Sequence, residues 1–143
     1  MPQTDTLFST EPALERAFLV GVGLRGQKRL FSTEDSLEEL ARLAETAGAV
    51  VVGRLIQRIS RPSRRAYYYI GKGRLAELAA LRGETDYTQV ILDDELSPVQ
   101  QRNLENALQV KVIDRTALIL DVFARRAQTK EGRLQVELAQ AQY

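Results

Sequence analysis

The chain has 143 residues, with 20 basic and 19 acidic side chains, and it contains no histidine, cysteine or tryptophan. This length bounds the chain at one domain with a small appendage. The absent cysteines exclude disulfides, thiolate nucleophiles and Cys-ligated metals, and the absent histidines exclude Ser-His-Asp and Cys-His machinery. No apolar run reaches the roughly 18 residues that suggest a membrane-spanning helix. We therefore expect a cytoplasmic protein with no metal site and no stable membrane insertion.

The near-neutral total charge conceals a strongly basic block. Residues 46–76 carry seven basic and no acidic side chains, whereas residues 1–45 and 77–114 are net negative and residues 115–143 are net positive. Arginine outnumbers lysine 16 to 4, and its planar guanidinium binds two phosphate oxygens at once. The block predicts contact with phosphate groups. The alternative is an ordinary basic surface loop in an arginine-rich protein.

Short apolar runs predict the strands. Residues 1–15 are expected to form a flexible N-terminus, and strands are predicted at 17–24, 49–56, 88–93 and 110–113. The second run is β-branched and apolar on both faces at its start, which is typical of a parallel sheet covered on both sides. A basic loop is predicted over 58–66, after the second strand.

Helical spacing and capping residues predict the helices. These are expected at 34–47, at 74–81, from Ser97-Pro98 to Leu108, and at 117–124 after Asp114. Ser97 and Gln100 have the spacing of a capping box, and Asp121 can pair with Arg125 four residues later. The alternation of strands and helices predicts an α/β fold over 16–114, with a small, mostly parallel four-stranded sheet flanked by helices.

The last segment has apolar side chains on two lines of a predicted helix. Leu134, Leu138 and Ala141 form one line, and Val136 and Tyr143 form the other. Such a helix needs a partner helix, and no stop signal precedes Tyr143. We expect a truncated helix, a chain that is a fragment of a longer protein, and self-association through the uncovered apolar surface.

Two glycine patterns suggest binding of phosphate-containing ligands. Residues 21–26 match G-x-G-x-x-G, but the next helix is expected only near residue 34, which favours a glycine-rich turn over a dinucleotide site. The tripeptide Gly71-Lys72-Gly73 lacks the spacing and the Ser/Thr of a Walker A loop. It leaves an anion site at a helix start, with Arg74, as a hypothesis.

An acidic cluster and a tyrosine cluster each allow two interpretations. The consecutive carboxylates Asp93, Asp94 and Glu95 follow a predicted strand. They could bind magnesium or share a proton, or they could favour the start of the next helix electrostatically. The three tyrosines at 67–69 could stack on bases or pack as strand residues.

RNA contact is the interpretation we favour for two groups of cations. Arginine and lysine side chains position a protein on nucleic-acid phosphates. The first group is Arg58, Arg61, Arg64, Arg65, Lys72 and Arg74, and the second is Arg125, Arg126, Lys130 and Arg133.

Four stretches together resemble one family of proteins. They span residues 68–78, 90–105, 112–127 and 129–140, and the most specific parts are Asp-Arg-Thr at 114–116, Leu-Asp-Val-Phe-Ala at 120–124 and Glu-Gly-Arg-Leu-Gln-Val-Glu-Leu at 131–138. The sequence over 17–143 is similar to the amino-terminal region of HflX-type ribosome-associated GTPases. That resemblance implies an amino-terminal α/β domain, a long two-helix hairpin and a Ras-like GTPase domain, with residues 115–143 as the truncated start of the hairpin.

The resemblance also implies a function in the cell. Members of the family bind the large ribosomal subunit and split or rescue stalled ribosomes. Their GTP-binding motifs would lie beyond Tyr143, so GTP and Mg²⁺ are implied for a GTPase domain that this chain lacks, and no cofactor is expected here. We expect a non-catalytic region that docks on ribosomal RNA. The alternative is a nucleotide- or anion-binding regulatory domain that restrains its own GTPase domain.

Overall fold

The computed structural model describes residues 14–24, 32–59 and 69–127. The chain forms, in order, β1 (Arg16–Leu24), α2 (Thr33–Thr46), β2 (Val50–Ile59), α3 (Lys72–Thr85), β3 (Gln89–Leu92), α4 (Pro98–Leu108) and β4 (Lys111–Asp114). A further helix covers residues 115–127. The strands and helices predicted within the described ranges are therefore confirmed, with bounds that move by a few residues. Residues 1–13 of the predicted flexible N-terminus and the helix predicted from Leu134 to Tyr143 lie outside the described residues. None of the helices in the described ranges is long and apolar enough to cross a membrane.

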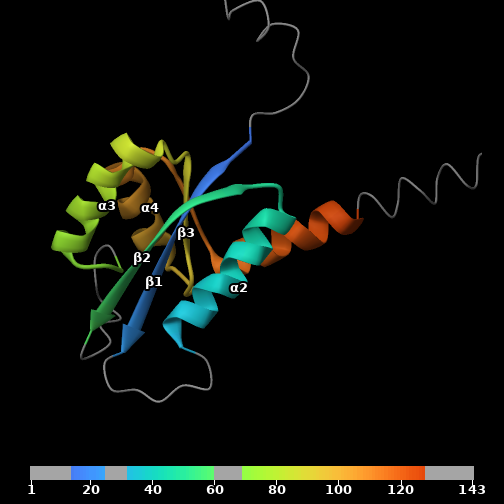
Figure 1. Cartoon of the computed structure of the whole chain (residues 1–143), viewed down its shortest axis with the longest axis horizontal. Helices are drawn as coiled ribbons and strands as arrows, with labels where there is room; N and C mark the ends of the chain where they lie inside the picture. Colours follow the sequence, from blue (N-terminus) through green and yellow to red (C-terminus); the bar gives the residue numbers. More distant parts are fainter. Residues whose placement is uncertain (1–13, 25–31, 60–68, 128–143) are drawn as a thin grey trace, which may run out of the picture.

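The four strands form one sheet in the order β2-β1-β3-β4. Every pairing is parallel, with Phe18 opposite Gly53 on one side and Val90 on the other, and with Val90 opposite Val112. The expected sheet, mostly parallel, is thus entirely parallel. Helix α2 and the helix over 115–127 lie on one face, and α3 and α4 lie on the other (Figure 1).

The core is divided between the two faces because strand side chains alternate. On β1, Phe18 and Val20 point toward α3 and α4, whereas Ala17 and Leu19 point toward α2 and the 115–127 helix. Leu78 and Leu104 fill the first layer, and the second layer contains Leu37, Leu40, Leu118 and Val122. Apolar residues on both faces of a central strand are what a doubly covered parallel sheet requires.

Side-chain caps fix the starts of three helices. The Ser32 hydroxyl accepts a hydrogen bond from the Asp35 amide at 3.1 Å, and Ser97 and Gln100 form the predicted capping box. Asp114 accepts from the Ala117 amide at 2.9 Å and, through its second oxygen, from the Leu96 amide at 3.0 Å. One residue therefore caps the 115–127 helix and also holds the segment before α4.

The paired glycines of β1 allow α2 to approach the sheet closely. A Cβ at Gly21 would lie 3.1 Å from Thr33 Cγ2, and a Cβ at Gly23 would lie 2.4 Å from Thr33 Oγ1. Helix α2 begins at Thr33 and not at the third glycine of the pattern. The structure therefore gives Gly21 and Gly23 a packing role within β1, which is neither the dinucleotide site nor the turn that the sequence suggested.

One aromatic pair anchors α3 to the sheet. The ring of Tyr87, which is 1% exposed, lies 5.5 Å from that of Phe18. Its hydroxyl donates a hydrogen bond to the Leu78 carbonyl at 2.8 Å. Burial raises the pKa of the Tyr87 hydroxyl, because the charged phenolate would be poorly solvated there.

Candidate nucleic-acid interface at the carboxyl edge of the sheet

Several predicted site residues lie together at the carboxyl ends of the parallel strands, which is called here the carboxyl edge of the sheet. The carboxyl ends of all the strands and the starts of the helices that follow them share this edge, where open α/β sheets place ligands. In Figure 1 it is marked by the arrowheads of β1 and β2 and by the start of α2. The side-chain oxygen of Gln57 accepts a hydrogen bond from the Gly71 amide at 2.9 Å, which ties the end of β2 to the start of α3.

Arg58 occupies a different position from the one expected. It lies within β2, not in a loop, and its guanidinium forms an ion pair with Glu34 of α2. Arg54, four residues earlier and on the same face of the strand, pairs with Glu38 at 2.6 Å. A hydrogen bond from Arg54, then its charge and that of Arg42, hold the pKa of Glu38 below its usual range. The side chain of Arg58 remains about half exposed, at 49%, so a phosphate can still reach it.

Lys72 and Arg74 lie in the first turn of α3, and both are exposed. Arg74 pairs with Glu77 at 2.7 Å, one turn further along the helix. This helix start has no side-chain cap and no acidic residue in its first turn, unlike that of α2. The predicted anion-binding segment Gly71-Lys72-Gly73 is therefore at the surface, with the Gly71 amide bonded to Gln57 and no capping side chain on the N-cap residue.

The tyrosine nearest to this helix start is held in an unusual conformation. Tyr69 has a φ of 70°, which is uncommon for a residue with a side chain. It lies outside the strands, and its hydroxyl donates a hydrogen bond to Asp94. Tyr67 and Tyr68 lie outside the described residues, as do Arg61, Arg64 and Arg65 of the basic loop.

The three acidic residues after β3 do not act as one group. Asp93 pairs with Arg115 at 3.1 Å, Asp94 accepts from Tyr69, and Glu95 is exposed. No set of three or more acidic, histidine or cysteine side chains in the described part of the chain is arranged to hold a metal ion. These contacts favour neither magnesium binding nor a shared proton.

Arg115 is the residue at this edge that sequence reasoning missed. Its guanidinium contacts Asp93 at 3.1 Å, Glu39 at 3.1 Å and the Ser36 hydroxyl at 3.3 Å. It therefore links the 115–127 helix to α2 and to the end of β3. The available signal was its position directly after a strand, because strands of a parallel sheet all end at this edge.

The second basic group lies at the opposite edge of the sheet. Arg125 is ten residues beyond Arg115, about 15 Å along the helix at 1.5 Å per residue. It pairs with Asp121 at 3.4 Å, as predicted, and a Cβ at Gly48 would lie 3.3 Å from its Nη1. Arg126 is also exposed, while Lys130 and Arg133 lie outside the described residues. The structure thus separates the Arg58, Lys72 and Arg74 group from the Arg125 and Arg126 group.

The fold is an open parallel α/β sheet with one group of cations at the carboxyl ends of its strands and another at the amino ends. Known proteins share this fold. The family described as GTP-binding GTPase N-terminal matches residues 34–124, and the chain belongs to that family. The GTPase HflX of Lacrimispora saccharolytica is 48% identical over 129 residues, which cover 90% of this chain and 29% of that relative. The GTPase HflX of Escherichia coli is 39% identical over 141 residues, covering 96% of this chain and 31% of that relative. The chain is therefore an HflX-type amino-terminal domain.

A solved structure supports the fold alone. The complex of SsGBP with GDP superposes with a TM-score of 0.57 at 24% identity, covering 90% of this chain and 35% of that chain. The chain spans less than a third of the length of the two curated relatives named above. What those proteins do as wholes therefore enters only as a proposal.

Proposed function

We propose that this chain is the ribosomal RNA-docking and regulatory region of a GTPase that binds the large ribosomal subunit and splits or rescues stalled ribosomes. In the full-length protein, GTP and Mg²⁺ would bind a separate GTPase domain, with which this domain would associate. The observation that carries the proposal is the exposed cationic edge formed by Arg58, Lys72 and Arg74. Membership in a GTPase family supports the rest.

Because the two basic groups are far apart, we expect RNA to contact them at separate places. Arg58 and Arg74 are held by surface ion pairs, which contribute little to stability and exchange readily for a phosphate partner. Arg125 and Arg126 lie at the other edge of the sheet, so one phosphate cannot contact both groups. We therefore expect RNA to contact each group separately, and losses at the two edges to add.

The test is binding of this chain to purified large subunits or ribosomal RNA across a salt series. Replacing Lys72 and Arg74 by alanine should weaken binding and reduce the slope of log affinity against log salt by roughly 2, about one per lost phosphate contact. The Arg125→Ala/Arg126→Ala variant should lower affinity by its own independent increment. The variant Arg64→Ala/Arg65→Ala tests the basic loop in the same way.

Two exposed cations outside both groups provide the matched control. Arg42 and Arg102 lie on α2 and α4, and replacing both by alanine removes the same charge. Their loss should leave the salt slope nearly unchanged. An affinity that does not depend on salt, or an equal loss in the control, contradicts docking through phosphates.

The second candidate function is anion or nucleotide binding at the start of α3. The observation that favours it is the uncapped, acid-free first turn that carries Lys72. Calorimetry of this chain with ATP, GTP and inorganic phosphate separates the two functions. Heat of binding that is lost in Lys72→Ala supports the anion site, whereas no heat with any of the three rejects it.

A further inference from the structure

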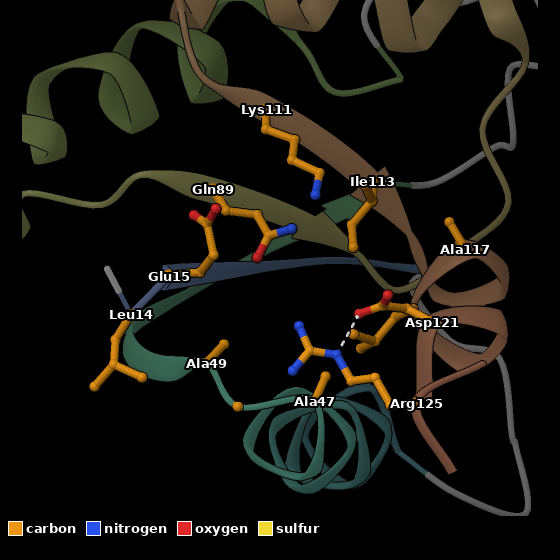
Figure 2. Close-up of a pocket in the computed structure, with 12 residues that line it drawn as sticks. Leu14, Glu15, Ala47, Ala49, Gln89, Lys111, Ile113, Ala117, Asp121 and Arg125 are labelled. Carbon is orange, nitrogen blue, oxygen red and sulfur yellow. Dashed lines mark ion pairs between the residues drawn. The ribbon is translucent and has the colours of Figure 1, made fainter. Parts of the chain in front are cut away.

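A cavity of about 440 Å³ lies at the amino ends of the strands, opposite the Arg58, Lys72 and Arg74 group and lined in part by Arg125. It opens between the end of α2, the starts of β3 and β4, and the 115–127 helix (Figure 2). Its volume falls in the range of small-molecule sites. Part of its wall is apolar and comes from Ala47, Ala49, Ile113, Ala117 and Leu118.

A buried polar side chain is directed into this cavity. Gln89 is only 5% exposed, and Figure 2 shows its amide pointing into the open space. Among the described residues no fully buried side-chain nitrogen or oxygen atom lacks a partner, so the Gln89 amide is open to the cavity and to the solvent in it. A ligand in the cavity would therefore find this amide accessible and could replace solvent as its hydrogen-bond partner.

Some charged side chains around the cavity have an ion-pair or hydrogen-bond partner, and one has no ion pair within the described ranges. Arg125 pairs with Asp121, and Glu15 accepts a hydrogen bond from the Thr88 hydroxyl at 2.7 Å. Lys111, at the start of β4, lines the same space and has no ion pair in the described part of the chain. Lys111 and Gln89 therefore offer a ligand one ammonium group and one amide within the same cavity lining.

We propose that this cavity binds a small aliphatic monocarboxylate. Lys111 would hold the carboxylate by a charge-assisted hydrogen bond, the Gln89 amide would donate a second bond to it, and the apolar wall would cover the alkyl chain. The two carboxylates of Glu15 and Asp121 at the same cavity disfavour a dianion such as phosphate. Lys111 and Arg125 likewise disfavour a cationic amine.

The experiment follows the side-chain amide resonances of Gln89 by NMR while butyrate is added to this chain. We expect saturable shifts with butyrate, and weaker effects with equal concentrations of inorganic phosphate and of n-butylamine. Lys111→Met should weaken butyrate binding about tenfold, which corresponds to the loss of one charged hydrogen bond.

Two further variants keep the proposal falsifiable. Arg102→Met removes an exposed charge far from the cavity wall and should leave butyrate affinity unchanged. Gln89→Leu should weaken butyrate binding, measured by backbone amide shifts, while its thermal midpoint without ligand stays nearly unchanged, because the amide is open to the cavity and its removal breaks no hydrogen bond among the described residues. The proposal is overturned by the absence of saturation, by unchanged affinity in Lys111→Met, or by tighter binding of phosphate or n-butylamine.

Discussion

Replacing Arg115 by methionine is expected to lower the free energy of unfolding by about 2 kcal/mol, because it leaves a largely buried carboxylate without its ion-pair partner. The partner, Asp93, has a side chain that is only 9% exposed, while that of Arg115 is 23% exposed. Methionine keeps most of the aliphatic stem, so the loss reports the guanidinium contacts more than packing. The same variant also loses the contacts to Glu39 and Ser36.

Urea unfolding followed by circular dichroism measures this change, and Arg74→Met is the matched control. Arg74 forms an exposed ion pair with Glu77 within one helix, and such pairs contribute about 0.5 kcal/mol or less. The double variant Arg115→Met/Asp93→Asn should be more stable than the sum of the two single losses implies, because it no longer contains a buried carboxylate without a partner. Equal losses in Arg115→Met and Arg74→Met would contradict the role that we assign to Arg115.

Gly53→Ala is expected to destabilise the fold by about 2 kcal/mol, in the range observed for overpacked cores. A Cβ at this position would lie 2.4 Å from Cε2 of Phe18 and 2.9 Å from its Cδ2. The ring of Phe18 is 2% exposed and is held against Tyr87, so it cannot move aside without disturbing the core. The thermal midpoint of the variant measures the effect.

Replacing a second glycine by alanine is expected to raise the stability of the chain, in contrast to Gly53→Ala. Gly83 lies within α3 with nothing within 4 Å of an added Cβ, so Gly83→Ala should stabilise the chain by up to about 1 kcal/mol. Adding Phe18→Leu to Gly53→Ala should recover part of the lost stability, because the smaller side chain relieves the contact. If both alanine variants shift the midpoint in the same direction, the close approach of Gly53 to Phe18 is not what decides the outcome.

Much of the architecture was predictable from local sequence patterns. The apolar runs placed the strands, and Ser97, Gln100 and Asp114 marked helix starts that the structure confirms. These signals are short-range, since a cap or an i,i+4 pair such as Asp121–Arg125 needs only one helical turn to form. The parallel sheet followed from the alternation of strands with helices.

The sequence by itself determined the α/β class and most element bounds, whereas the tertiary structure decided which charges meet. Arg58 and Glu34, and likewise Arg115 and Asp93, lie more than twenty residues apart in the chain, and only the packing of helices on the sheet brings each pair together. The same packing puts Arg125 at the other edge from Lys72 and directs Gln89 into a cavity. Local patterns encode helices and strands, but the position of an ion pair or a cavity depends on strand order and helix placement, which no short stretch contains.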